Sequence, residues 1–161
     1  MKSQSVRSKV RETHLAKKAV IYIRTAVSAA NKYAHTHGSL ERQLSMRDVA
    51  IDYGWPSGNV VIFQDERKPG DTTEDREAYT RMVQEIAARR VGAVLFVDAT
   101  RVTRSASDWL KFCSLCEAAD TLLISELGVY DLRNLEDKLF LSSSDVTTEL
   151  DLTVTHKRLR E

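Results

Sequence analysis

The chain has 161 residues, of which 42% are hydrophobic and 29% charged, a composition typical of one domain with an apolar core. It contains no apolar run of membrane-spanning length and no stretch typical of a signal peptide. Its two cysteines are too few for a disulfide framework, so we expect a cytoplasmic protein without a membrane partner. A net charge of +1 argues against strong charge-driven binding of nucleic acid by the body of the domain.

Residues 1–18 form a basic N-terminal arm. The arm carries Lys2, Arg7, Lys9, Arg11, Lys17 and Lys18 against a single acid, Glu12. Arms of this kind often contact nucleic acid, and they as often remain solvated and disordered leaders. Both interpretations stay open.

Strand and helix patterns alternate after the arm. The apolar run 19–23 predicts a first strand that ends at Arg24. Ser39 is the expected N-cap of a helix that stops at Gly54. Its apolar face is expected to comprise Leu40, Leu44, Val49 and Ile51. The run 60–63 predicts a second strand, and residues 65–73 a polar loop.

The second half continues the alternation. A helix with Tyr79, Met82, Val83 and Ile86 on one face precedes an uncharged run, 93–97, which predicts a strand buried on both faces. Ser105, Ser107 and Asp108 are alternative caps for the next helix, whose apolar face is expected to hold Leu110, Cys113 and Cys116, with Trp109 as an optional member. The run 121–124 predicts a fourth strand. Residues 128–131 then lead into a final amphipathic helix with Val146, Leu150 and Val154 on its apolar stripe.

These patterns predict an α/β fold with a mostly parallel sheet flanked by helices. The last helix follows an apparently complete sheet, so we expect it to pack on a partner subunit. The predicted organisation is a basic arm over 1–18, an α/β domain over 19–135 and a long amphipathic oligomerisation helix over 136–161.

Several arginines fall where a parallel sheet binds ligands. Arg24, Arg101 and Arg104 follow strands, and Arg76 lies in the first turn of a helix. Guanidinium groups match phosphate geometry, so the pattern predicts a phosphate site that needs no metal or other cofactor. The alternative is that these arginines merely face solvent. The chain lacks a glycine-rich phosphate loop, which argues against a nucleotide partner.

Cys113 and Cys116 are best interpreted as buried structural thiols, because they share the apolar face of a helix. A zinc site formed with His35 and His37 is a weak alternative, since the spacing fits no common ligand pattern.

Short motifs in a fixed order resemble the N-terminal catalytic domain of serine recombinases, the resolvase/invertase group, and most closely its large-recombinase branch. The resemblance covers residues 18–160. It is carried by the segments 22–24, 39–43, 54–56, 65–76, 101–105, 108–109, 128–131, 137–139 and 149–151.

The resemblance implies a defined chemistry. A serine attacks a phosphate of double-stranded DNA, forms a phosphoserine bond, and subunits of a tetramer exchange the ends without metal or ATP. By resemblance, Arg24, Arg76, Arg101 and Arg104 would hold the scissile phosphate, and Tyr22 belongs to the same motif as Arg24. Gln43 would order the site. The helix carrying Glu149, with Val146 and Leu150, would form the dimer or tetramer interface.

Departures from the family pattern concern the reacting group. The nucleophilic serine of the family corresponds to Ala26, which has no oxygen to attack phosphorus. The serine before the loop glycine is Pro69, and the acid before the first arginine of the pair is Thr100. Three explanations remain open: a natural, catalytically inactive relative, a shifted nucleophile at Ser28, or an engineered loss of serine, which the change at Pro69 disfavours.

The sequence therefore predicts a serine-recombinase-like protein that binds DNA and is impaired in cleavage, so its status as an enzyme is open. The alternative is a non-catalytic regulator or accessory subunit of a full-length recombinase. A third reading is a monomeric domain that binds a small phosphate compound. Family members carry a separate DNA-binding domain after the last helix, and the sequence stops at Glu161.

Overall fold

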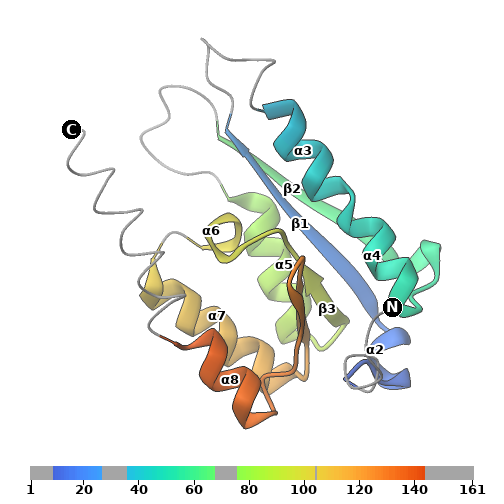
Figure 1. Cartoon of the computed structure of the whole chain (residues 1–161), viewed down its shortest axis with the longest axis vertical. Coiled ribbons are helices and arrows are strands. Elements are labelled where there is room, and N and C mark those ends of the chain that lie inside the picture. The colour runs from blue at the N-terminus through green and yellow to red at the C-terminus, as the bar shows by residue number, and fades with distance from the viewer. Residues whose placement is uncertain (1–8, 27–35, 68–75, 104, 144–161) are drawn as a thin grey trace.

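The computed structural model describes residues 9–26, 36–67, 76–103 and 105–143 (Figure 1). Thirteen elements lie within these ranges. They are α2 (Glu12–Leu15), β1 (Lys18–Ala26), α3 (Thr36–Leu44), α4 (Met46–Tyr53), η1 (Ser57–Asn59), β2 (Val60–Arg67), α5 (Glu77–Ala87), β3 (Val91–Leu95), α6 (Ala99–Val102), α7 (Ala106–Ala119), β4 (Leu122–Ser125), β5 (Gly128–Tyr130) and α8 (Leu135–Leu141).

The five strands form one sheet in the order β2-β1-β3-β4-β5. The first four strands are parallel, and β5 pairs antiparallel with β4. This arrangement confirms the predicted α/β class with a mostly parallel sheet. The strand β5 was not predicted: it has three residues, begins with Gly128 and buries only Val129, too little for a sequence signal.

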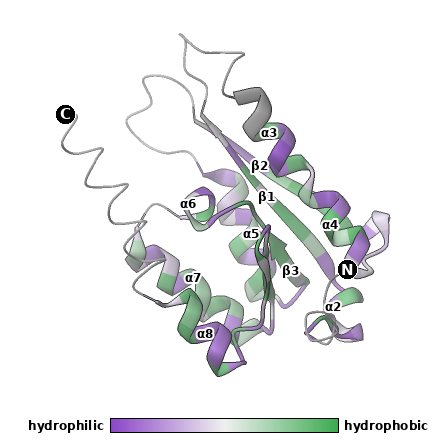
Figure 2. Ribbon diagram, in the orientation of Figure 1, coloured by the Kyte–Doolittle hydropathy of each residue, from purple (hydrophilic) through white to green (hydrophobic). Residues whose placement is uncertain are grey.

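Two hydrophobic clusters lie on opposite faces of the sheet, because successive strand residues point to opposite sides. Val20 and Tyr22 of β1 belong to the cluster that α5 and α7 cover. Ala19, Ile21 and Ile23 belong to the cluster that α4 covers, with Leu40 of α3 packed against it. Figure 2 shows hydrophobic residues along the middle of β1 and along β3, as expected for strands buried on both faces.

The helix predicted between Ser39 and Gly54 is in fact two helices, α3 and α4, with Ser45 between them. Ser39 is not the N-cap, because α3 begins at Thr36. The Ser45 hydroxyl donates to the carbonyl of Arg42 at 2.6 Å, a local bond that competes with helix continuation. The predicted face was also partly wrong, since Leu44 and Ile51 are exposed. Gly54 ends α4 as predicted, with a φ of 118° that favours glycine.

Three further corrections concern the strand ends. The first strand does not end at Arg24, because β1 continues to Ala26 and Arg24 is paired with Asp65 of β2. The predicted loop from residue 65 begins too early, because β2 continues to Arg67 and includes Asp65. The short helix α6 follows β3 where only a polar breaker was expected. The cap of α7 is Ser105, one of the three candidates, whose hydroxyl accepts the N–H of Asp108 at 3.1 Å. Trp109 is fully buried, whereas Leu110 is exposed.

Part of the predicted arm is packed against the domain. Residues 9–18 contain α2 and the first residue of β1. The Trp55 indole N–H donates to the carbonyl of His14 at 3.1 Å. The same carbonyl group of His14 also packs closely against Gly92. A Cβ at position 92 would lie 2.1 Å from the carbonyl oxygen, so glycine is required there.

The predicted C-terminal helix lies mostly outside the described residues, and with it Val146, Glu149, Leu150 and Val154. Its assignment and the three predicted domain boundaries stay predictions. No helix in the described ranges is long and apolar enough to cross a membrane.

Candidate phosphate site

Three polar side chains meet at the carboxyl end of the sheet. Tyr22 of β1 is fully buried and donates its hydroxyl to Asp65 of β2 at 2.6 Å. Arg76, which precedes α5, donates to the Tyr22 oxygen at 3.1 Å. A carboxylate, a phenol and a guanidinium therefore form one hydrogen-bonded chain across three elements.

Asp65 also fixes the start of α5. Its two carboxylate oxygens accept the backbone N–H groups of Ala78 and Tyr79, each at 2.9 Å. These N–H groups belong to the first helical turn, which has no partners within the helix. The capping side chain thus comes from a neighbouring strand, since Arg76 at the N-cap position makes no side-chain cap.

Arg76 is held from three sides. Besides Tyr22, its guanidinium donates to the carbonyl of Val102 in α6. Its central carbon lies 3.9 Å from the ring centroid of Tyr79, a close cation–π contact. The guanidinium is therefore preorganised between β1, α5 and α6.

Burial raises the pKa of the Tyr22 phenol, and its hydrogen bond to Asp65 raises that pKa further. Burial also raises the pKa of Tyr79. Both phenols therefore stay neutral at physiological pH, and Tyr22 acts as a donor to Asp65 and an acceptor from Arg76. These donor and acceptor roles agree with the hydrogen-bond distances of 2.6 Å to Asp65 and 3.1 Å from Arg76.

An aromatic chain connects this site with the core. Tyr22 and Tyr79 have ring centroids 5.7 Å apart, and Tyr79 lies 6.1 Å from Phe112. Phe112 packs against Trp109, whose indole N–H donates to the Leu141 carbonyl at 3.0 Å. The site rests on packed rings, so its side chains have little room to shift.

Gln43 of α3 fixes the backbone of Arg24. Its side-chain oxygen accepts the Arg24 N–H at 2.9 Å, and its side-chain nitrogen donates to the Arg24 carbonyl at 3.3 Å. The pairing of β1 with β3 stops at Ile21, whereas its pairing with β2 continues to Ala26. The Gln43 amide therefore takes the place of β3 beside Arg24. Gln43 is itself buried, with 1% of its surface exposed.

Arg101 lies on α6, which follows β3. Asp98 caps this helix by accepting the N–H of Thr100 at 3.0 Å, and it also accepts the Thr100 hydroxyl. Residues 98–100, which were predicted to be a polar breaker, therefore form the capped start of a helix. Arg101 therefore lies on the same helical turn as Val102, whose carbonyl accepts a hydrogen bond from Arg76.

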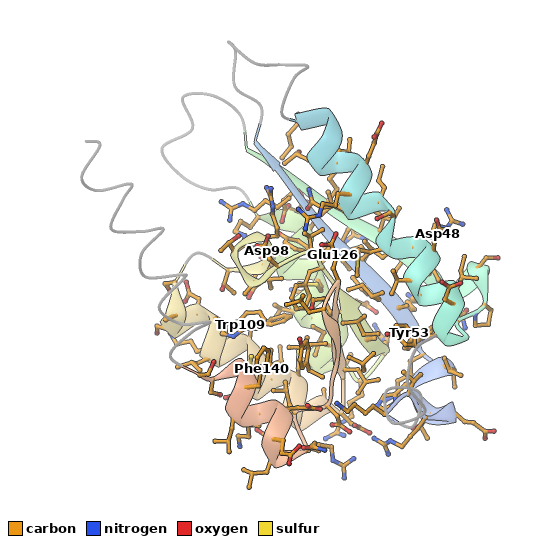
Figure 3. The ribbon with its side chains drawn as sticks, viewed as in Figure 1. Asp48, Tyr53, Asp98, Trp109, Glu126 and Phe140 are labelled. Atoms are coloured by element: carbon orange, nitrogen blue, oxygen red, sulfur yellow. The ribbon has the colours of Figure 1, made fainter. Side chains whose placement is uncertain are left out.

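Acidic groups also gather at this end of the sheet. Asp98 and Glu126 follow the adjacent strands β3 and β4 and are labelled in Figure 3. Glu126 accepts two bonds from Arg42, at 2.7 and 2.5 Å, and these lower the pKa of the Glu126 carboxyl. The carboxyl end is therefore a mixed-charge surface.

The structure connects most of the predicted site residues that it describes. Tyr22 bonds Arg76, Gln43 bonds Arg24, and Arg101 lies on the helix that bonds Arg76. Ala26 is the last residue of β1, where its backbone is paired with Arg67. Ser28, Arg104, Val146, Glu149 and Leu150 lie outside the described residues.

Asp65 is the organising residue that the predicted site set missed. Its sequence signal was weak, because an acid after a hydrophobic run is common at the start of a loop. Its three bonds depend on Tyr22 and α5, which are distant in sequence.

Cys113 and Cys116 are both buried on α7, as predicted. Burial raises the pKa of Cys113 to about 12 and raises that of Cys116 as well. Thiolates are the reactive and metal-binding form, so both residues behave as packing groups. His35 is outside the described residues, as is the side chain of His37.

Known proteins share both the sequence pattern and the fold. The chain is 31% identical over 159 residues to an uncharacterized protein, y4bA/y4pH, of Sinorhizobium fredii strain NBRC 101917 / NGR234. The match covers 98% of this chain and 23% of that protein, so the chain spans about a quarter of its relative's length.

Two solved structures share the fold at 23% sequence identity. The N-terminal catalytic domain of TP901-1 integrase aligns with a TM-score of 0.53, over 89% of this chain and 99% of that one. A resolvase family site-specific recombinase from Streptococcus pneumoniae aligns with a TM-score of 0.58, over 89% and 93%. The family profile described as "Resolvase, N terminal domain" matches residues 19–161. The chain therefore belongs to the resolvase N-terminal domain family, the family of serine-recombinase catalytic domains.

Proposed function

We propose that this chain serves site-specific DNA recombination as a serine-recombinase-like domain that holds a DNA phosphate in an arginine cluster and is impaired in strand cleavage. The observation that carries the proposal is the immobilised Arg76, held by Tyr22, Val102 and the ring of Tyr79. We further propose that the domain resembles the large-recombinase branch most closely.

Phosphate transfer explains why such immobilisation is useful. Charge increases on the phosphoryl oxygens as the transition state forms, and fixed guanidinium groups stabilise that charge without reorganising. Arg76 sits beside the strand that carries Arg24 and the helix that carries Arg101. We assign these three residues and Arg104 to phosphate binding, with no metal or other cofactor.

Tyr22, Asp65 and Gln43 act as positioning residues in this proposal. Asp65 fixes both Tyr22 and the start of α5, and Tyr22 in turn receives Arg76. Gln43 fixes the backbone at Arg24. Their contribution is placement, to which phosphate chemistry is sensitive at the scale of about an ångström.

Ala26 is the reason for proposing impaired cleavage. It stands two residues after Arg24, where the family pattern has its serine, and its methyl group cannot form a phosphoester. The domain then keeps the arginines that we propose bind phosphate but lacks a nucleophile at this position. Ser28 is the competing candidate for a nucleophile.

The test is covalent capture of DNA at low salt, where binding that depends on charge is strongest. Supercoiled plasmid is incubated with the unaltered chain, with Ala26→Ser, and with Ala26→Ser combined with Arg76→Gln. Denaturing gels then detect nicked DNA and protein–DNA adducts. Of the three samples, only the Ala26→Ser single variant should form an adduct. The unaltered chain lacks the serine, and the double variant lacks the fixed guanidinium of Arg76.

Two results would contradict parts of this proposal. An adduct of the unaltered chain that maps to Ser28, and that Ser28→Ala abolishes, would show an active enzyme with a shifted nucleophile. An Ala26→Ser chain that is folded and binds DNA but never forms an adduct would argue against the arginine grip.

The absence of a serine at position 26 also favours a second function, that of a non-catalytic subunit which pairs with an active recombinase. Pairing would use the proposed oligomerisation helix, with Val146, Leu150 and Glu149 at the interface. Co-expression with a full-length recombinase should then give mixed dimers or tetramers, measured by light scattering. Charge substitutions at Val146 and Leu150 should abolish them.

A further inference from the structure

A cavity of about 370 Å³ opens at the amino end of the parallel sheet. It is lined by Ala16, Lys17, Lys18, Asn59, Arg89 and Arg90. These residues immediately precede or begin β1, β2 and β3, so the cavity lies at the end of β1 opposite Arg24. Figure 1 shows α2 beside this end of the strand.

The lining carries more positive charge than the fold neutralises. Glu85 pairs with Arg90 at 3.1 Å and approaches Lys18 at 3.9 Å. The side chains of Lys17 and Arg89 make no hydrogen bond or ion pair with the part of the chain that the structure describes. Four cations thus share one acid around one cavity.

The backbone at Arg89 makes the cluster more unusual. Arg89 has a φ of 62° and lies just after α5, where its N–H bonds the Ile86 carbonyl and the Arg90 N–H bonds the Glu85 carbonyl. This pattern closes many helices, and glycine is the preferred residue at the left-handed position. The other non-glycine residue with positive φ in the described ranges is Asp120, a type that tolerates this region better.

Favourable interaction with the carboxyl end of α5 does not explain the cluster. A cation near a helix C-terminus is stabilising, and Arg90 already supplies one. Lys17 comes from the other side of the cavity, in the connection between α2 and β1. Arg89 thus occupies a strained left-handed position, yet its side chain makes no hydrogen bond or ion pair within the described residues that would offset the strain, and this points to a ligand.

We propose that this cavity, the amino-end basic site, binds the phosphate backbone of double-stranded DNA. It adds a second contact to the one proposed at the carboxyl end. The basic arm supports DNA over an isolated phosphate compound, because Lys2 and Arg7 precede the packed segment in sequence. Lys9 and Arg11 are paired with Asp137 and Asp120, so these two side chains anchor the segment while Lys17 faces the cavity.

Salt dependence of DNA binding tests the proposal. Binding of a short labelled duplex to the whole chain is measured by fluorescence anisotropy at several salt concentrations. Each lost phosphate contact should reduce the slope of log affinity against log salt by about 0.9 and weaken binding several-fold at low salt. We expect this loss for Lys17→Gln and for Arg89→Gly.

Arg89→Gly separates binding from folding. It removes the charge and also relieves the left-handed strain, so the thermal unfolding midpoint should rise while DNA affinity falls. Lys111→Gln is the matched control, since Lys111 is an exposed lysine on α7 that does not line the cavity. Equal losses in all three variants would mean diffuse charge attraction and overturn the site.

Other ligands give different results. If inorganic phosphate protects the fold of the unaltered chain but the duplex slope is the same in every variant, the site takes small phosphates and the DNA assignment is wrong. If Arg89→Gly changes only the mass measured by light scattering, the surface binds protein, and the assignment is again wrong.

The proposal rests on DNA being the ligand, and its failure can be told apart from failure of the recombinase chemistry. Unchanged duplex binding by Arg89→Gly together with adduct formation by Ala26→Ser would overturn only the amino-end site. A reduced slope without any adduct would overturn only the chemistry proposed for the carboxyl end.

Discussion

At the carboxyl end of β1, Arg76 is fixed by a phenol, a carbonyl and an aromatic ring, whereas at the amino end Lys17 and Arg89 contact no acceptor in the described structure. Basic side chains gather at both ends, among acidic groups at the carboxyl end and around the single acid Glu85 at the amino-end basic site. The difference is that burial and neighbouring acceptors define one guanidinium geometry at the carboxyl end, as transition-state stabilisation requires. Mobile, hydrated cations suffice for backbone binding.

One acidic residue at each end of the sheet shows the same contrast between a buried and a more exposed environment. Asp65 is 7% exposed and accepts three bonds from Tyr22, Ala78 and Tyr79. Asp120 is more exposed and pairs with Arg11, His14 and Arg133. Burial alone would raise the pKa of Asp120, but the hydrogen bonds from Arg11 and His14 lower it overall.

The largest expected change in stability comes from substituting these two acids. Asp65→Asn keeps the size of the side chain but leaves one amide oxygen for three donors. Buried donors then go unsatisfied, so the free energy of unfolding should fall by about 3 kcal/mol. Asp120→Asn, the matched change, should cost only about 1 kcal/mol, because its partners Arg11 and Arg133 are exposed to water and the new amide oxygen can still accept from His14. Urea unfolding of both variants measures the difference, and equal losses would contradict the contrast between the two ends.

A smaller effect is expected from two neighbours on α3. Gln43→Met preserves volume but removes both bonds to the Arg24 backbone, so we expect a loss of about 1 kcal/mol. Arg42→Gln removes a well-aligned ion pair with Glu126, yet the Arg42 side chain is 63% exposed. Its thermal unfolding midpoint should be unchanged within error.

Comparing the two variants identifies what positions α3 against β1. If Arg42→Gln destabilises the protein as much as Gln43→Met, the exposed ion pair rather than the buried amide fixes the helix. That result would also weaken the positioning role proposed for Gln43.

Sequence periodicity predicted the core strands and α5 because their burial is continuous or regularly spaced. It could not predict β5, whose pairing with β4 depends on a contact across a turn. It also missed α6, since a four-residue helix capped by Asp98 has too few residues for a periodic pattern.

The site was predictable to a different degree. The predicted strand ends indicated the region of Arg24 and Arg101, since ligand sites of parallel sheets lie beyond such ends, although Arg24 lies within β1 rather than after it. The role of Asp65 was not predictable, because both of its partners are brought to it by the tertiary fold. The end of the sheet at which these arginines lie was thus predictable from sequence, but the contacts that support their side chains were not.

The smallest expected effect is a pH dependence at the amino end. His14 is buried, and burial lowers its pKa below the usual value of 6.5, despite a hydrogen bond to Asp120 that opposes the shift. The unfolded chain therefore binds a proton more readily than the folded one just below pH 6.5. The contribution of His14 to stability is complete above that pH and declines as the pH falls toward the lower folded pKa.

The test is the change in unfolding free energy between pH 7.5 and pH 5.5, about one unit on either side of the unfolded pKa. The difference should shrink in His14→Gln. That variant loses the bond from the Arg11 N–H to Nδ1 of His14, so its stability falls at both pH values and only the difference between them is informative. The Asp120 carboxylate does not confuse this window, because its lowered pKa places its own loss of stability below its usual value of 3.8. An unaltered pH difference in His14→Gln would mean that protonation at this end of the sheet is not coupled to folding. Ordinary packing of the segment before β1, rather than the charge state of His14, would then account for its attachment to the domain.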